Sequence, residues 1–475
     1  MIDTLIRGDC VATLHGLGAW DVAIEGERIA AVAAAGTFAD RDAGRVIDAR
    51  GRIVIPGGID PHIHCKFPQP MGTTSAPPVH VSRAALFGGT TTMLDFAVWD
   101  RGETLQQTLE KREEDCWRGQ CYCDYGFHVL LSGKMPLEIF DQIPEVIQAG
   151  FPSIKMFMTE VRPERSNWKL DLGDIWEVLQ VLGKHEGIAC IHAEDNDLVM
   201  HMYEKMFRED RVAFQHMAEV HSSLSEDISY RRIIRLAENV DRAAVYLMHT
   251  SARTGVDAIA ESRARGFPIY GETLHQYALF TSEDYLRPNG QIYHTYPSLK
   301  MKRDHKALWD GMHSGTISCI ATDGICTPLA IKTSGERIDN TVGGNVGVEP
   351  RLSVMYTETV VNRGWPIPLF VDLVAANAAR IFGFYPRKGV IAPGSDADIV
   401  ILDPALRRRL RKEDLHEADY SPWEGYEVAA WPQMTLLRGK AVVEGTSFLG
   451  DPRDGHLLKR KLAEPILNGP ACARA

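Results

Sequence analysis

Short runs in which apolar and polar residues alternate occupy the two ends of the chain. This period of two is typical of strands that bury one face, and the Gly and Asp residues between the runs favour turns. The runs predict strands at residues 4–7, 19–24, 29–33 and 52–55, and again at 389–392, 398–402 and 434–443. We expect an antiparallel sheet at the start of the chain. We further expect residues 1–55 and 387–450 to pair into one small β-sandwich domain.

Between these ends, over residues 56–386, the pattern changes. Short apolar runs rich in β-branched residues alternate with longer stretches that have apolar residues every three to four positions, as in parallel βα units. The short runs predict strands at 59–64, 90–96, 125–131, 153–158, 188–193, 244–250, 268–273 and 317–322. The longer stretches predict helices at 172–184, 230–239, 255–265, 304–313 and 369–382. Eight strands close a barrel, so the expected fold class is α/β, a (β/α)8 TIM-like barrel beside the β-sandwich.

The last stretch, residues 451–475, has no clear core pattern. It contains three consecutive basic residues, Lys459, Arg460 and Lys461. The simpler interpretation is a surface C-terminal tail. The alternative is an arm at a subunit interface of a homo-oligomer.

Composition and charge narrow the class of protein. Of the 475 residues, 45% are hydrophobic and 24% are charged, which is ordinary globular composition with room for two cores. The formal net charge of −11 gives no basic face, so we expect no nucleic-acid partner. There is no apolar run of about 18 residues, and we expect no membrane partner. The 9 cysteines are scattered and no signal-like segment opens the chain, so we expect reduced thiols and a cytoplasmic location.

Metal-binding side chains stand where several predicted barrel strands end. Barrels of this type carry their reactive groups at the carboxyl ends of the strands. The first strand ends in His62 and His64, which strand alternation places on the same face. The fifth, sixth and eighth strands end at His192, His249 and Asp323. One HxH pair is a weak signal, but the agreement of four strands favours a metal site.

The fourth predicted strand places Lys155 among apolar neighbours at the same end. A buried ammonium is costly there and repels cations. Carboxylation of the amine by carbon dioxide removes its positive charge and supplies two oxygens that can bridge two metal ions. Without the histidines, a snorkelling or salt-bridged lysine would be the simpler interpretation.

The strand order of these residues resembles the amidohydrolase superfamily. The flanking residues resemble its cyclic amidase branch, the dihydropyrimidinases and hydantoinases. The matching stretches are 56–64 (PGGIDPHIH), 71–75 (MGTTS), 83–91 (RAALFGGTT), 192–194 (HAE), 347–349 (GVE) and 377–397. The similarity extends over nearly the whole chain.

The resemblance implies a hydrolase with two divalent metal ions, usually zinc, although manganese or cobalt would also suit these ligands. By that resemblance, the ligands of one ion are His62, His64 and Asp323, those of the other are His192 and His249, and carboxylated Lys155 bridges them. A hydroxide that bridges the metals would attack the ring carbonyl, and Asp323 would pass the proton to the leaving nitrogen. The resemblance also implies a homotetramer and no organic cofactor.

Three positions depart from the family pattern. Glu160 stands where the family usually has a tyrosine whose hydroxyl supports the developing oxyanion. Either another donor replaces that tyrosine, or Glu160 binds a different substrate, or it turns outward. Gly324 replaces a frequent histidine, and Tyr296 replaces a serine whose contribution is largely made by its backbone. Glu160, Tyr296 and Gly343 are therefore the candidate substrate-binding residues.

A basic and aromatic segment follows Glu160. It contains Arg162, Arg165 and Trp168 and could close over an anionic or planar substrate. Charged residues of this kind more often face solvent, and that alternative stays open.

The preferred function is the opening of a cyclic amide or ureide ring, with hydantoin-like or dihydropyrimidine-like substrates. An alternative is a different ring, such as an allantoin-type ureide, a cyclic imide or a lactam, and the missing tyrosine raises its standing. A non-catalytic scaffold should have lost ligands, whereas all six candidate positions are intact. A single-metal deaminase would have no use for Lys155.

Overall fold

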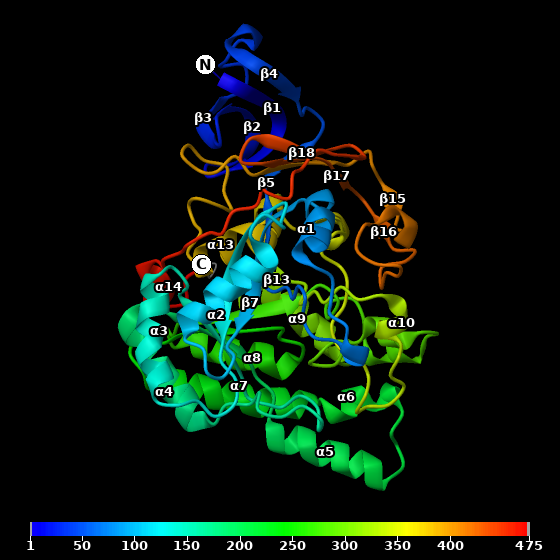
Figure 1. Ribbon diagram of the computed structural model, residues 1–475. Coiled ribbons are helices and arrows are strands. Elements are labelled where there is room, and N and C mark those ends of the chain that lie inside the picture. Colours follow the sequence, from blue (N-terminus) through cyan, green and yellow to red (C-terminus); the bar gives the residue numbers. More distant parts are fainter. Residues whose placement is uncertain (1, 473–475) are drawn as a thin grey trace.

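The computed structural model describes residues 2–472, which form two main sheets and the helices around them (Figure 1). One sheet has eight strands and the other has nine, and a two-stranded ribbon accompanies them in the described part of the chain. In Figure 1 the nine-stranded sheet lies above the eight-stranded one, and its blue N-terminal strands lie beside orange strands from near the C-terminus.

The eight-stranded sheet is the predicted barrel. Its strands follow one another in chain order, and every neighbouring pair is parallel. They are β6 (Gly58–Asp60), β7 (Thr90–Val98), β8 (Asp124–Leu130), β9 (Ser153–Phe157), β10 (Ile188–His192), β11 (Ala244–Leu247), β12 (Ile269–Leu274) and β13 (Ile317–Ala321). Beyond the first and last strands, Ile63 forms a parallel bridge with Gly324, which brings the two edges of the ring together. The eight predicted strands and the fold class are confirmed.

Helices surround this barrel, as its parallel topology requires. They are α1 (Pro78–Phe87), α2 (Leu105–Arg112), α3 (Glu138–Gln148), α4 (Leu172–His185), α5 (Asn196–Arg208), α6 (Met217–Val220), α7 (Ser223–Ala237), α8 (Arg253–Ala264), α9 (Lys302–Ser314), α10 (Leu329–Lys332), α11 (Arg351–Tyr356), α12 (Ile367–Val371) and α13 (Asn377–Ile381). A π-helical segment, Asp372–Ala376, joins α12 to α13, so the helix predicted at 369–382 is present but is not a uniform α-helix. Within residues 2–472, no helix combines the length and the apolar character needed to cross a bilayer.

The nine-stranded sheet joins the two ends of the chain. Its strands are β1 (Ile2–Thr13), β2 (Gly16–Glu25), β3 (Arg28–Ala34), β4 (Ala43–Asp48), β5 (Ile53–Pro56), β14 (Ile399–Asp403), β17 (Trp431–Leu437), β18 (Lys440–Glu444) and β19 (Ser447–Phe448), while β15 (Arg408–Arg409) and β16 (Glu427–Val428) form the ribbon. The antiparallel pair β5–β14 connects the N-terminal half of the sheet to the C-terminal half.

Three details of this sheet differ from the sequence prediction. The N-terminal part is mixed and not purely antiparallel, because β1 pairs in parallel with β4 and β5. Strand β4 was not predicted because its residues show no clear alternation: Ile47 is its one buried residue, and the neighbouring Val46 and Asp48 are both exposed. Residues 389–392 form no strand and instead lie in a turn segment before β14.

The C-terminal segment from Asp451 to Cys472 packs against its own chain near the start of β8, so this part of the predicted tail is not a free surface segment, and residues 473–475 lie outside the described residues. Its apolar side chains join a core with residues from inside the barrel. The buried ones are Leu458, Leu462, Ile466 and Leu467. Arg460, which is 5% exposed, donates through Nη2 to the carbonyl of Phe127 at 2.5 Å and to Ser153 Oγ at 3.1 Å. This packing could not be predicted from the sequence, because the segment is largely irregular and its apolar residues follow neither a helical nor a strand periodicity.

A buried charge cluster holds the nine-stranded sheet against the barrel. Lys388 Nζ, on a side chain that is 1% exposed, lies 2.5 Å from Asp124 at the start of β8. It also lies 2.7 Å from Asp398 and 2.9 Å from Asp396, which precede β14. Arg438 forms a second ion pair with Asp124. Burial alone lowers the pKa of the Lys388 amine, but the three carboxylates outweigh it and raise that pKa.

Replacing Lys388 with Met is expected to lower the free energy of unfolding by about 3–5 kcal/mol, because the buried carboxylates lose their shared cation. Lys440→Met is the control, since Lys440 pairs with Asp454 on a side chain that is 47% exposed and such pairs contribute about 1 kcal/mol or less. Urea unfolding followed by circular dichroism measures both. Equal midpoints for the two variants would contradict the role of this cluster.

Candidate metal centre

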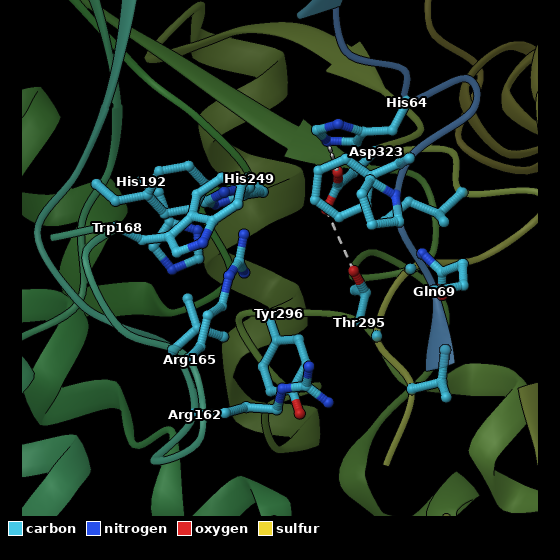
Figure 2. A pocket seen from close by; sticks show the side chains of 18 of the residues that line it. His64, Gln69, Arg162, Arg165, Trp168, His192, His249, Thr295, Tyr296 and Asp323 are labelled. Carbon is cyan, nitrogen blue, oxygen red and sulfur yellow. Dashed lines mark hydrogen bonds and ion pairs between the residues drawn. The ribbon is translucent and has the colours of Figure 1, made fainter. Parts of the chain in front are cut away.

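Six side chains predicted as metal ligands line one cavity of about 420 Å³ (Figure 2). The cavity lies at the carboxyl ends of the barrel strands. Strands β9 and β10 carry Lys155 and His192, and the other four residues follow directly after strands β6, β11 and β13. The six are His62, His64, Lys155, His192, His249 and Asp323. The shape of the barrel therefore brings together donors that are far apart in the sequence.

His62, His64 and Asp323 form the tightest group. Their donor atoms all lie within 4.8 Å of one another. Asp323 Oδ1 is 3.1 Å from His62 Nε2 and 3.0 Å from His64 Nε2. Burial alone raises the pKa of Asp323, but the two imidazoles outweigh it and hold that pKa well below its ordinary value. Asp323 is therefore a carboxylate at neutral pH, as a metal ligand must be.

His192 and His249 form the other half of the cavity floor. Their ring centroids are 4.5 Å apart, and the ring of His249 is 5.5 Å from that of His62. Burial lowers the pKa of His192 to about 4 and that of His249 well below its ordinary value. Both imidazoles are thus neutral at pH 7, which is the form that binds metal ions.

Lys155 is 1% exposed and has no carboxylate partner among residues 2–472. Its Nζ lies 2.9 Å from Met248 Sδ and 4.7 Å from the centroid of the Phe157 ring. Burial lowers the pKa of this amine to about 8, although the charge of Asp323 opposes that change. The uncharged amine, which is the form that reacts with carbon dioxide, is therefore readily accessible.

Two buried glutamates orient the histidines, and the sequence analysis assigned no role to either. His62 Nδ1 donates to Glu272 Oε1 at 2.8 Å, which turns His62 Nε2 toward the cavity. His192 Nε2 donates to Glu194 Oε2 at 2.9 Å, which leaves its Nδ1 as the free nitrogen. Glu194 could have been identified from the sequence, because it belongs to the HAE motif at residues 192–194. Glu272 was detectable only as a charged residue inside the apolar run of the seventh strand.

The backbone at two of the candidate ligands is unusual. His249 has φ of 43° and Asp323 has φ of 49°, in the left-handed region that residues with a Cβ rarely adopt. Both lie two residues after the end of a barrel strand, where the chain turns sharply. Such strain is retained mainly where the surrounding structure and the function require it.

Glu160 lies outside the cavity lining. Its carboxylate accepts hydrogen bonds from the backbone N–H groups of Asn167, at 3.2 Å, and Trp168, at 2.9 Å. It therefore closes residues 160–168 into a compact loop and is not placed to touch a substrate. Of the alternatives for Glu160, the structure favours the one in which it turns away from the site.

Tyr296 and Gly343 both line the cavity and lie against each other. A Cβ at Gly343 would lie 2.3 Å from Tyr296 Cδ2, so the tyrosine ring occupies the space that a side chain there would need. Gly324 is also constrained, because it bridges to Ile63 and Asn345 and a Cβ there would lie 3.0 Å from Thr322 Oγ1. Tyr296 thus shapes the cavity wall, whereas Gly324 lies at the closure of the barrel and is not among the lining residues.

The remaining lining includes three aromatic rings, and the centroid of the Trp168 ring lies 6.1 Å from that of Phe67 and 5.4 Å from that of Phe157. Arg162 and Arg165 project from the same loop as Trp168 (Figure 2). Thr295 Oγ1 donates to Asp323 Oδ2 at 3.2 Å, which fixes the second oxygen of that carboxylate.

Four imidazoles, one carboxylate and one lysine amine are a donor set suited to two divalent cations of the zinc type once the amine is carboxylated. Pairs of donors already face one another across the cavity, and two carboxylates behind them fix the ring orientations. The site therefore fits metal-dependent hydrolysis.

Known proteins match nearly the whole length of the chain. The profile of the Amidohydrolase family matches residues 175–442. The D-hydantoinase of Streptomyces coelicolor is 34% identical over 474 residues, which covers 95% of this chain and 96% of the relative. The D-hydantoinase of Geobacillus stearothermophilus is 31% identical, with 96% of each chain covered.

Solved structures agree with the sequence comparison. The dihydropyrimidinase of Brevibacillus agri NCHU1002 superposes with a TM-score of 0.91 at 30% identity, covering 98% of this chain and 100% of that one. The L-hydantoinase of Arthrobacter aurescens shares the fold with a TM-score of 0.85 at 23% identity. By sequence and by structure, this chain belongs to the amidohydrolase family, in its hydantoinase and dihydropyrimidinase group.

Proposed function

We propose that the protein is a metal-dependent hydrolase that opens a cyclic amide or ureide ring. The observation that carries this proposal is the convergence of four imidazoles, one carboxylate and one buried amine, from five barrel strands, on a single cavity. Its membership of a group of ring-opening hydrolases supports the same activity. A non-catalytic scaffold would be expected to lack some of these donors, so the intact set argues against that alternative.

The ligand assignment is part of the proposal. His62, His64 and Asp323 would hold one ion, His192 and His249 would hold the other, and Lys155, once carboxylated, would supply a ligand to both. Zinc is the proposed metal because it suits imidazole and carboxylate ligands. When bound, such ions lower the pKa of water to near neutrality and polarise a carbonyl oxygen.

Asp323 is the proposed proton carrier. The low pKa of Asp323 keeps its carboxylate ionised. The hydroxyl of Thr295 donates a hydrogen bond to Oδ2, while Oδ1 faces the histidines. In this role Asp323 takes a proton from the nucleophilic water and delivers it to the ring nitrogen as the C–N bond breaks. The aromatic walls of the cavity exclude bulk water while this happens.

The ring itself is proposed to lie against Tyr296 and Gly343, where backbone groups can hydrogen-bond to its N–H and C=O groups. Hydantoin-like and dihydropyrimidine-like rings are the first candidates, since these are the names that the relatives carry. A homotetramer stays a prediction from the resemblance, and a cytoplasmic location stays a prediction from the N-terminal segment and the cysteines.

The metal-loaded protein is expected to open at least one ring in a panel of hydantoin, dihydrouracil, allantoin, succinimide and a lactam. Asp323→Asn should lower kcat by about a thousandfold, because the amide cannot accept the proton and is a poorer ligand. Asp310→Asn is the matched control, since Asp310 is 64% exposed on α9. Ring opening followed by ultraviolet absorbance measures this. Full activity of the Asp323 variant would refute the assigned role.

Glu272→Gln is expected to weaken metal binding by about 10–100-fold, because it removes the carboxylate that accepts the His62 Nδ1–H. Glu261→Gln, at a site 52% exposed, is the control. Titration of the metal-free proteins with zinc against a chromophoric chelator gives both affinities. Identical affinities for the two variants would show that Glu272 does not support the metal centre.

A further inference from the structure

Two arginines face the cavity, and both lie on the loop that Glu160 closes. Arg162 and Arg165 belong to the cavity lining, together with Trp168 of the same loop. Arg162 Nη1 is 3.4 Å from the carbonyl of Thr341, which is a weak contact. Within residues 2–472, the guanidinium of Arg165 has no carboxylate and no hydrogen-bond acceptor. Both cations are thus directed at the cavity and not at an ion-pair partner.

The guanidinium of Arg165 is held by aromatic rings. Its Cζ lies 3.6 Å from the centroid of the Trp168 ring, 5.5 Å from that of Phe157 and 6.0 Å from that of Phe67. Stacking on a ring face stabilises the cation and leaves its N–H groups free in the guanidinium plane. Those N–H groups match the two oxygens of a carboxylate in a bidentate pair.

The loop is built to keep this arginine in place. The carboxylate of Glu160 ties the two ends of the loop together through Asn167 and Trp168. Inside the loop, Arg165 N donates to the carbonyl of Arg162 at 3.1 Å. Val161 and Asn167 have φ of 68° and 65°, so the chain turns sharply at both ends. A preorganised cation loses less entropy when it binds an anion.

The charges around the cavity favour an anion. Asp323 is the only carboxylate of the lining within the described chain, and His62 and His64 already neighbour it. Burial lowers the pKa of Arg165, and the charge of Arg162 lowers it further, although a guanidinium stays protonated at neutral pH. Because both cations are partly withdrawn from water, an anion bound between them would stabilise them strongly.

The position of Arg165 relative to the candidate ligands limits the size of the ligand. Arg165 and two candidate metal ligands contact the same ring, that of Phe157. The centroid of this ring lies 5.5 Å from Arg165 Cζ, 4.7 Å from Lys155 Nζ and 4.9 Å from the centroid of the His192 ring. A group bound at Arg165 is therefore adjacent to the metal ligands. A ring at the metal centre can reach the arginine with a short side chain.

We propose that Arg165, assisted by Arg162, binds the anionic side chain of the substrate, which is a cyclic amide or ureide bearing a short carboxylate-terminated substituent. The inference rests on the proposed function for the ring, and it adds the specificity for the substituent. A neutral substituent would leave the two cations without a partner, and a longer one would extend past the aromatic wall.

Ring-opening kinetics on a matched pair of substrates test this proposal. Hydantoin bearing a 2-carboxyethyl group at C5 is compared with its 2-carbamoylethyl isostere, which differs only in charge. The metal-loaded protein is expected to prefer the carboxylate by about tenfold or more in kcat/KM, the usual size of a charge-assisted hydrogen bond. In Arg165→Gln this ratio should fall to about threefold or less, and Arg165→Lys should lie between, because it keeps the charge and loses the bidentate fork.

Arg41→Gln is the control for overall charge, because Arg41 is 89% exposed in the nine-stranded-sheet region and should keep the wild-type ratio. A wild-type protein that opens both hydantoins equally, or an Arg165→Gln variant that retains the preference, would overturn the inference while the proposed ring chemistry stands. If no ring is opened, the proposed function fails instead.

Binding of glutarate decides the inference independently of catalysis. Calorimetric titration of the metal-loaded proteins should give an affinity about tenfold weaker for Arg165→Gln than for Arg41→Gln. Equal affinities would overturn the anion site whether or not a ring is opened.

Discussion

The parallel closure of the barrel is the constraint on which the site depends. Because all eight strands run in one direction, their carboxyl ends meet at a single rim, and residues from positions 62 to 323 reach one cavity. Closure also buries Lys155 and withdraws its amine from water, which lowers the pKa of that amine. The buried glutamates then fix the imidazoles, and the strained backbone at His249 and Asp323 aims the last two side chains. Two sets of contacts far from the cavity stabilise these strands. They are the packing of the C-terminal segment against the barrel and the Lys388 cluster.

The sequence carried much of this information. Strand-end residues such as His62 and Asp323 could be found because barrel strands are short apolar runs that stop where the reactive groups begin. Other features were hidden for physical reasons. Glu272, on the seventh strand, accepts a hydrogen bond from His62, which follows the first strand. The sequence around Glu272 does not indicate that these two strands lie near each other. The C-terminal segment packs through irregular backbone, so its apolar residues follow no period. The role of Glu160 depends on two backbone N–H groups seven and eight residues later, which only the folded loop brings to it.

Barrel strands and loops contribute different parts of the cavity. Barrel strands place the donors, whereas the loop of residues 160–168 and the Tyr296–Gly343 contact shape the wall that a substituent meets. In this protein the position usually occupied by a tyrosine holds a glutamate that organises its loop, and the loop presents Arg165 on an aromatic wall.

We propose that Lys155 becomes a carboxylate that holds two metal ions together. The most direct measurement is to load the protein with zinc in ¹³C-bicarbonate, count the metal per chain and record the ¹³C spectrum. We expect about two metal ions per chain and a carbamate carbon signal that is missing from Lys155→Arg. One metal ion or fewer, with no carbamate signal in the wild-type protein, would contradict it.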